Sequence, residues 1–225
     1  SSTTLSTGER WFARFGIRPE DKAATALMFG NMFMSGIAIG MIRVCAFTLF
    51  LAQWESEQLA LIAILIAIVG MPMTLIIDRL THRFAVRTYL FTILRIIFAG
   101  LAIFRVLLGI SDSSILIFTL PLFFELVYML FSLQFVALLS RLLNVRQTKR
   151  LSGIARSGEF LAEMVCGFFV LILLNFIQVA DLLVVAMLTT LVVFGIVSYT
   201  VSHFRSTLYS LDEHNQENAY ESRLL

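Results

Sequence analysis

Residues 141–167 read RLLNVRQTKRLSGIARSGEFLAEMVCG, and our prediction of the topology of the chain starts from this stretch. Its first part is a predicted basic loop that holds Arg141, Arg146, Lys149, Arg150 and Arg156. Beyond the loop, small residues recur every fourth position, a spacing that lets one membrane helix approach another closely. These residues are Gly158, Ala162 and Cys166. The stretch therefore predicts the orientation of the chain in a membrane and a tightly packed neighbour for the helix that follows.

The composition predicts an all-α membrane protein. Of the 225 residues, 59% are hydrophobic and 14% are charged, whereas a soluble domain has about 45–50% apolar and about 25% charged residues. Several segments exceed the roughly 20 apolar residues that cross a bilayer. Cys45 and Cys166 both lie in such segments. We therefore expect them to pack as small apolar side chains and to form neither a disulfide framework nor a metal site.

We expect three regions along the chain. Residues 1–23 form a polar N-terminal segment with an amphipathic stretch at the lipid headgroups, residues 24–205 form a six-helix transmembrane domain, and residues 206–225 form a polar tail or linker. The predicted spans cover residues 24–51, 59–77, 84–109, 115–143, 158–177 and 182–204. The first span carries Gly36 and Gly40, a GxxxG spacing that brings another helix close.

Basic residues near the span ends predict the orientation. Four lie in the N-terminal segment, three between spans two and three, five between spans four and five, and two in the tail, which makes fourteen on one side. The other three loops hold none. Both termini are therefore predicted to be cytoplasmic, or to face the interior of an organelle.

Three charged residues lie deep within predicted spans: Arg43, Arg95 and Glu125. Each costs about 2.5–3.5 kcal/mol at a helix centre, so none is expected to face lipid. Glu125 shares a helix face with Tyr128 and Ser132, which predicts a polar stripe that points into the bundle. One interpretation is that these five residues line a path for an anionic substrate or for protons. The other is that Glu125 pairs with one or both arginines and holds the bundle together.

Two further features each allow two interpretations. Glu159 and Glu163 lie one turn apart near the start of predicted span five, where acids stabilise a helix N-terminus and pair with nearby arginines. They are also placed to bind a cation or to serve acid–base chemistry. The basic loop sets topology by the positive-inside rule, or it binds nucleotide phosphates or anionic lipid headgroups.

The sequence contains no P-loop, dinucleotide fingerprint, HExxH or CxxC motif. His82, His203 and His214 have no metal-ligand spacing. We therefore predict that the chain is not an enzyme, has no catalytic residues, carries no cofactor or metal, and does not bind nucleic acid.

Six spans with both ends on one side are typical of half of a twelve-helix carrier built from two inverted three-helix repeats. The segment Asp78-Arg-Leu-Thr-His-Arg83 resembles the inner-loop signature of the major facilitator superfamily, GxxxDRxGRR. This resemblance implies a cytoplasmic gate formed by Asp78, Arg79 and Arg83.

The chain also resembles the nucleotide (ATP/ADP) translocase family over essentially its whole length. The resemblance rests on Phe15-Gly-Ile-Arg-Pro-Glu20, on Thr48-Leu-Phe-Leu51, and on Val145-Arg-Gln-Thr-Lys-Arg-Leu151 followed by Gly158. It implies the N-terminal half of a facilitator-type fold, with spans one and four lining a central cavity and span three more peripheral. This placement favours Arg43 and Glu125 as cavity residues over Arg95.

Two functions are compatible with these observations. In the first, the chain is a half-transporter that moves an anionic metabolite or nucleotide by alternating access after pairing with a second six-helix half. In the second, it is a carrier-derived subunit that no longer transports and that anchors, scaffolds or senses within a larger membrane complex. In both, Gly36, Gly40, Gly158, Ala162 and Cys166 form a face for helix packing or for a partner. The expected location is a bacterial inner membrane, with the inner membrane of an organelle as the alternative.

Overall fold

The computed structural model describes residues 22–83, 86–111, 113–142 and 145–203, and these residues form six α-helices, one short 3-10 helix and no strand. The helices are α2 (Lys22–Gln53), α3 (Gln58–Arg83), α4 (Val86–Ile110), α5 (Ser114–Leu142), α6 (Val145–Leu173) and α7 (Leu182–His203), with η2 (Val179–Asp181) before α7. The predicted all-α class is confirmed. Most of the predicted N-terminal segment and the whole predicted tail lie outside the described residues.

Four of these helices are long and apolar enough to cross a membrane, within the described parts of the chain. They correspond to Lys22–Gln53, Arg87–Ile110, Ser114–Ser140 and Val179–His203, and a shorter apolar helix covers Gln58–Pro72. A helix satisfies its own backbone hydrogen bonds, which is what hydrocarbon requires of a spanning segment. The chain is therefore an integral multi-pass membrane protein.

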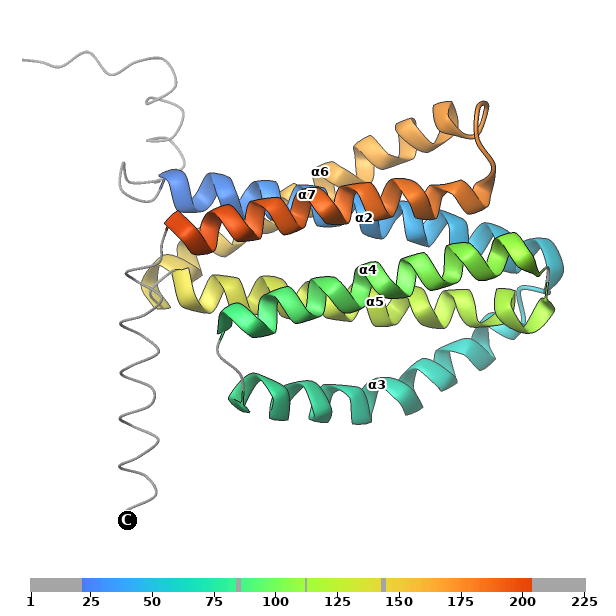
Figure 1. Ribbon diagram of the computed structural model, residues 1–225, viewed down its shortest axis with the longest axis horizontal. Coiled ribbons are helices and arrows are strands. Elements are labelled where there is room, and N and C mark those ends of the chain that lie inside the picture. Colours follow the sequence, from blue (N-terminus) through green and yellow to red (C-terminus); the bar gives the residue numbers. More distant parts are fainter. Residues whose placement is uncertain (1–21, 84–85, 112, 143–144, 204–225) are drawn as a thin grey trace, which may run out of the picture.

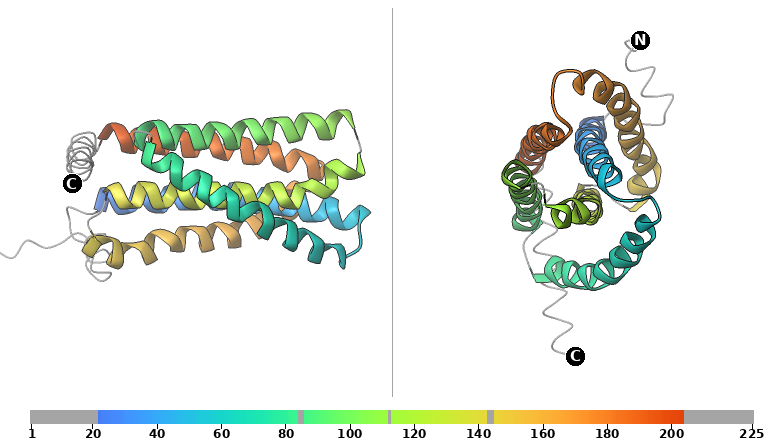
Figure 2. Two further views of the ribbon diagram at one scale, coloured as in Figure 1. Left: turned by 90° about the horizontal axis from the view of Figure 1, so that it is seen from below. Right: turned by 90° about the vertical axis from the view of Figure 1, so that its right-hand side faces the viewer.

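Helix α2 lies at the centre of the bundle. It contacts α5, α6 and α7, while α4 contacts α5 and α7 (Figures 1 and 2). Helix α3 contacts mainly α5, and it curves along its length, with Pro72 in its interior (Figure 1). A proline removes one backbone hydrogen bond and bends a helix in this way.

The buried core follows from this arrangement. Its largest side chains come from α2, α4 and α5, and they include Met28, Ile42, Phe50, Leu90, Leu94, Ile97, Phe131 and Phe135. Many large apolar side chains on the outer helix faces are exposed, such as Phe168 at 72% and Phe176 at 82%. Such faces are compatible with lipid because the tails of a bilayer are as apolar as the side chains themselves.

The structure corrects the prediction for the basic stretch. Helix α6 begins at Val145, thirteen residues before the predicted start of span five at Gly158. Residues 145–157 are mostly Arg, Lys, Gln, Leu, Ile and Ala, which form helices readily, and they include no proline. Hydropathy marks where a helix becomes apolar, and this helix starts well before that point.

Candidate functional site

The interface between α2 and α6 is made by the small residues Gly36, Gly40, Gly158, Ala162 and Cys166, which we call the small-residue interface. A Cβ added to Gly158 would lie 2.7 Å from the carbonyl oxygen of Phe29 and 3.2 Å from the amide nitrogen of Phe33. A Cβ on Gly36 would lie 2.7 Å from the Cβ of Ala162. The two helix backbones are thus so close that no larger side chain fits between them, as the four-residue spacing predicts.

An ion pair crosses the edge of this interface. The guanidinium of Arg43 on α2 donates a hydrogen bond through Nη2 to Oε1 of Glu163 on α6. The side chains of Arg43 and Glu163 are 41% and 37% exposed, and the guanidinium also lies 5.7 Å from the centre of the Phe124 ring on α5. The partner of Arg43 is therefore Glu163, and among the described residues Glu125 makes no ion pair.

The same contact changes the interpretation of the two glutamates. Since α6 begins at Val145, Glu159 and Glu163 lie four to five turns inside the helix, and the prediction that they stabilise its N-terminus is wrong. Glu163 pairs with an arginine, but that arginine comes from α2 and not from the basic stretch. No group of three or more possible metal-ligating residues occurs in the described parts of the chain.

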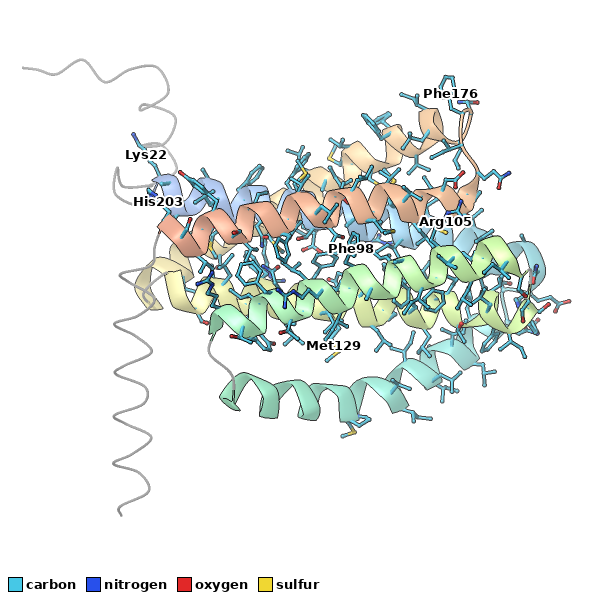
Figure 3. The ribbon with its side chains drawn as sticks, in the orientation of Figure 1. Lys22, Phe98, Arg105, Met129, Phe176 and His203 are labelled. Atoms are coloured by element: carbon cyan, nitrogen blue, oxygen red, sulfur yellow. The ribbon has the colours of Figure 1, made fainter. Side chains whose placement is uncertain are left out.

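The predicted polar stripe of α5 lines a cavity of about 320 Å³ between α3 and α5. Glu125, Tyr128 and Ser132 are on its α5 side, and Ile66 and Gly70 are on its α3 side. Met129, which also lines the cavity, lies on the side of α5 that faces α3 (Figure 3). We call this space the α3–α5 cavity. Glu125 is the charged group among its lining residues, so the cavity is suited to a proton or a cationic group.

A second, smaller cavity of about 10 Å³ adjoins it at the junction of α2, α5 and α6. Tyr128 and Ser132 line both cavities, and Ser35, Arg156 and Glu159 line the smaller one. Its volume is close to that needed for a single water molecule. Tyr128 and Ser132 therefore lie between the α3–α5 cavity and the smaller cavity, which Gly36 of the small-residue interface also lines.

Arg95 lies in a different part of the bundle from the two cavities described above. Its side chain is exposed and lines a cavity between α4 and α7, together with Phe98 and Phe194. The structure thus brings Tyr128 and Ser132 together with Glu125, and it places Arg43 on a neighbouring surface, but it does not bring Arg95 to either. The side chains of Asp78, Arg79 and Arg83 lie outside the described ones, so the predicted gate stays a prediction.

No family model, curated protein or solved structure matches this chain.

Two polar contacts between side chains far apart in the sequence are not predicted by the sequence patterns. The amide nitrogen Nδ2 of Asn31 on α2 donates a hydrogen bond to Oε1 of Gln134 on α5 at 3.4 Å, and both side chains are fully buried. Arg105 on α4 donates from Nη2 to Oδ1 of Asp181 at 2.6 Å. An intramembrane Asn or Gln is the signal that could have identified the first contact, because such side chains bond across helices.

Proposed function

We propose that the chain is one half of a secondary transporter, with six spans arranged as two inverted three-helix repeats and both termini on the cytoplasmic side. The observation that supports this proposal best is the pattern of helix contacts. In an inverted repeat α2 would be equivalent to α5, α3 to α6, and α4 to α7. A contact between two helices should then recur between their two equivalents, which we call its counterpart.

Among the described residues the more extensive contacts satisfy this requirement, although the two members of a pair differ in extent, whereas the small contacts of α5 with α6 and of α3 with α4 have no counterpart of similar extent. The contact between α2 and α6 has its counterpart between α5 and α3, and the contact between α2 and α7 has its counterpart between α5 and α4. Exchange of the two repeats leaves the contact of α2 with α5 and the contact of α4 with α7 unchanged, because each joins a helix to its own equivalent. The match supports a facilitator-type half in which α2 and α5 are the central pair, as the resemblance to the nucleotide translocase family implies.

The residues of α2, α5 and α6 suggest how such a half would handle a solute. Arg43 is the cation that would bind an anionic metabolite or nucleotide, and it is held by Glu163 in the structure. An anion would therefore replace Glu163 at the guanidinium, and Glu163 would return when the anion leaves. Glu125, in the α3–α5 cavity, would exchange a proton or bind a cationic group.

The proposal is tested by counterflow in proteoliposomes that contain the full chain, with a panel of nucleotides and organic anions. We expect exchange of at least one anion. Arg43→Gln and Glu125→Gln should each lower its rate about tenfold or more, which corresponds to roughly 1.4 kcal/mol on the barrier. Arg87→Gln is the matched control, because Arg87 is an exposed arginine at the start of α4. Absence of exchange for every anion, or equal loss in the control, would contradict the proposal.

The second candidate is a non-transporting subunit, and the Arg43–Glu163 pair favours it, because the predicted substrate-binding arginine already has a protein partner. In that case the pair holds α2 against α6 and has no exchange role. Co-purification with other membrane subunits at fixed stoichiometry, together with unchanged assembly in Arg43→Gln and no counterflow, would select this function over the first.

A further inference from the structure

Arg95 is a charged side chain within a candidate membrane span that lacks a partner among the described residues. It lies nine residues after Val86, which is about 13 Å along α4, and its side chain is exposed. In the described part of the chain it makes no ion pair and no hydrogen bond to another side chain. A lone guanidinium at this depth is costly unless an anion neutralises it.

The two helices that line the cavity do not supply that anion. Neither α4 nor α7 contains an Asp or a Glu. Asp181, just before α7, is already bonded to Arg105 at 2.6 Å. The counter-charge for Arg95 must therefore come from outside the α4–α7 pair.

The surroundings of Arg95 indicate what carries this charge. Its cavity has a volume of about 220 Å³ and is otherwise lined by Leu94, Phe98, Thr190, Leu191 and Phe194. The hydroxyl of Thr190 donates to the carbonyl oxygen of Ala186 at 2.7 Å, so it is engaged within α7. Phe98 lies at the junction of α4 and α7 (Figure 3). One cation beside apolar walls, between two membrane helices, suits a ligand with an anionic head and an apolar chain.

We propose that the α4–α7 cavity binds an anionic phospholipid, with its phosphate on the guanidinium of Arg95 and an acyl chain along Phe98 and Phe194. Arginine binds phosphate oxygens in a bidentate manner, and its long side chain extends toward the headgroups. Basic pockets between membrane helices are known sites for anionic lipid headgroups. The site lies on the α4–α7 side of the bundle, so the proposal does not depend on transport.

The test is native mass spectrometry of the full chain in nanodiscs of phosphatidylcholine with or without phosphatidylglycerol. We expect one retained phosphatidylglycerol on the unchanged chain. Arg95→Gln should reduce its occupancy about tenfold, the effect of a lost hydrogen bond to a charged group. Arg95→Lys keeps the charge and should retain most of the lipid. Arg87→Gln should retain it within about twofold, because Arg87 does not line the cavity.

Three results would overturn the proposal. The first is equal retention of phosphatidylcholine and phosphatidylglycerol by the unchanged chain. The second is displacement of the lipid by millimolar inorganic phosphate, which would indicate a site for free anions. The third is loss of another protein subunit in Arg95→Gln with an unchanged lipid count, which would assign the groove to an acidic partner helix. Circular dichroism of each variant confirms that the helices are intact, and if Arg95→Gln does not fold, retention in Arg95→Lys compared with Arg95→Met decides the question.

Discussion

The α2–α6 and α3–α5 contacts occupy equivalent positions in the proposed repeat, and they are built differently. Between α2 and α6, added Cβ atoms on Gly36, Gly40 and Gly158 would lie within 2.7 Å of the neighbouring helix. Between α3 and α5, a Cβ on Gly70 would meet nothing within 4 Å, and a cavity of about 320 Å³ separates the helices there. Figure 2 shows α3 on the outside of the bundle, against α5.

A glycine alone does not bring two helices together: Gly36, Gly40 and Gly158 do so where small side chains or bare backbone face them from the other helix. On α6, Ala162 and Cys166 stand opposite Gly36 and Gly40. On α5, the residues that face Gly70 across the cavity are large or polar, among them Glu125, Tyr128 and Met129. Close packing resists displacement, whereas an open contact permits it. We therefore expect α2 and α6 to move as one body and α3 to move against α5.

The largest expected effect comes from filling the small-residue interface. Gly158→Leu should lower the free energy of unfolding by about 3 kcal/mol, because the new side chain meets the backbone of Phe29 and Phe33, which cannot move aside. Gly153→Leu, on the same helix, should change it by no more than about 1 kcal/mol, since nothing lies within 4 Å of a Cβ there. Denaturant titration in mixed micelles measures both values. A Gly70→Leu variant as unstable as Gly158→Leu would show that the α2–α6 and α3–α5 contacts do not differ in how closely they pack.

The Arg43–Glu163 pair should have the next largest effect. Arg43→Gln or Glu163→Gln alone should cost about 2 kcal/mol, less than the 3–5 kcal/mol of a fully buried pair, because both side chains are about two-fifths exposed. The double variant should lose less free energy of unfolding than the sum of the losses in the two single variants. A double-mutant cycle measures the coupling, which we expect to be about 1 kcal/mol or more. Additive losses would show that the contact does not hold α2 to α6.

Much of this fold could be predicted because hydropathy and turn residues determine where apolar helices lie. The predicted starts and ends of α2, α4, α5 and α7 agree with the structure to within about two residues, and the role of Gly158 in close packing was predicted from its spacing alone. The start of α6 could not be predicted from hydropathy, since its first turns are polar. The partner of Arg43 could not be predicted either, because 120 residues separate Arg43 from Glu163 and only the packing of α2 on α6 brings them together.

A compensating pair should have a smaller effect within the small-residue interface. A Cβ on Gly40 would lie 2.6 Å from Sγ of Cys166, so Gly40→Ala should cost about 1–2 kcal/mol. Cys166→Gly combined with Gly40→Ala removes the colliding sulfur and should recover most of that loss. Denaturant titration in mixed micelles measures the free energy of unfolding of both variants. No recovery in the double variant would show that Gly40 is required for another reason.

The smallest expected effect concerns the buried amides. Gln134→Leu should cost about 1 kcal/mol, because it leaves Asn31 without its hydrogen-bond partner in an apolar core. Replacing both, in Asn31→Leu with Gln134→Leu, should cost less than Gln134→Leu alone, since no polar group is then left unpaired. Unfolding of the two variants under identical lipid conditions decides this. A larger loss in the double variant would mean that the amides have further partners.

The expected difference in mobility between the two contacts is tested most directly by spin-label distance measurements in nanodiscs. One label pair joins α3 to α5 at the exposed positions Ile68 and Val136, and the other joins α2 to α6 at Leu51 and Phe168, with Cys45 and Cys166 replaced by alanine. We predict a broad α3–α5 distance distribution that shifts when an anion that exchanges in the counterflow assay is added, and a narrow α2–α6 distribution that does not. Equal widths, or a shift confined to the α2–α6 pair, would contradict the account.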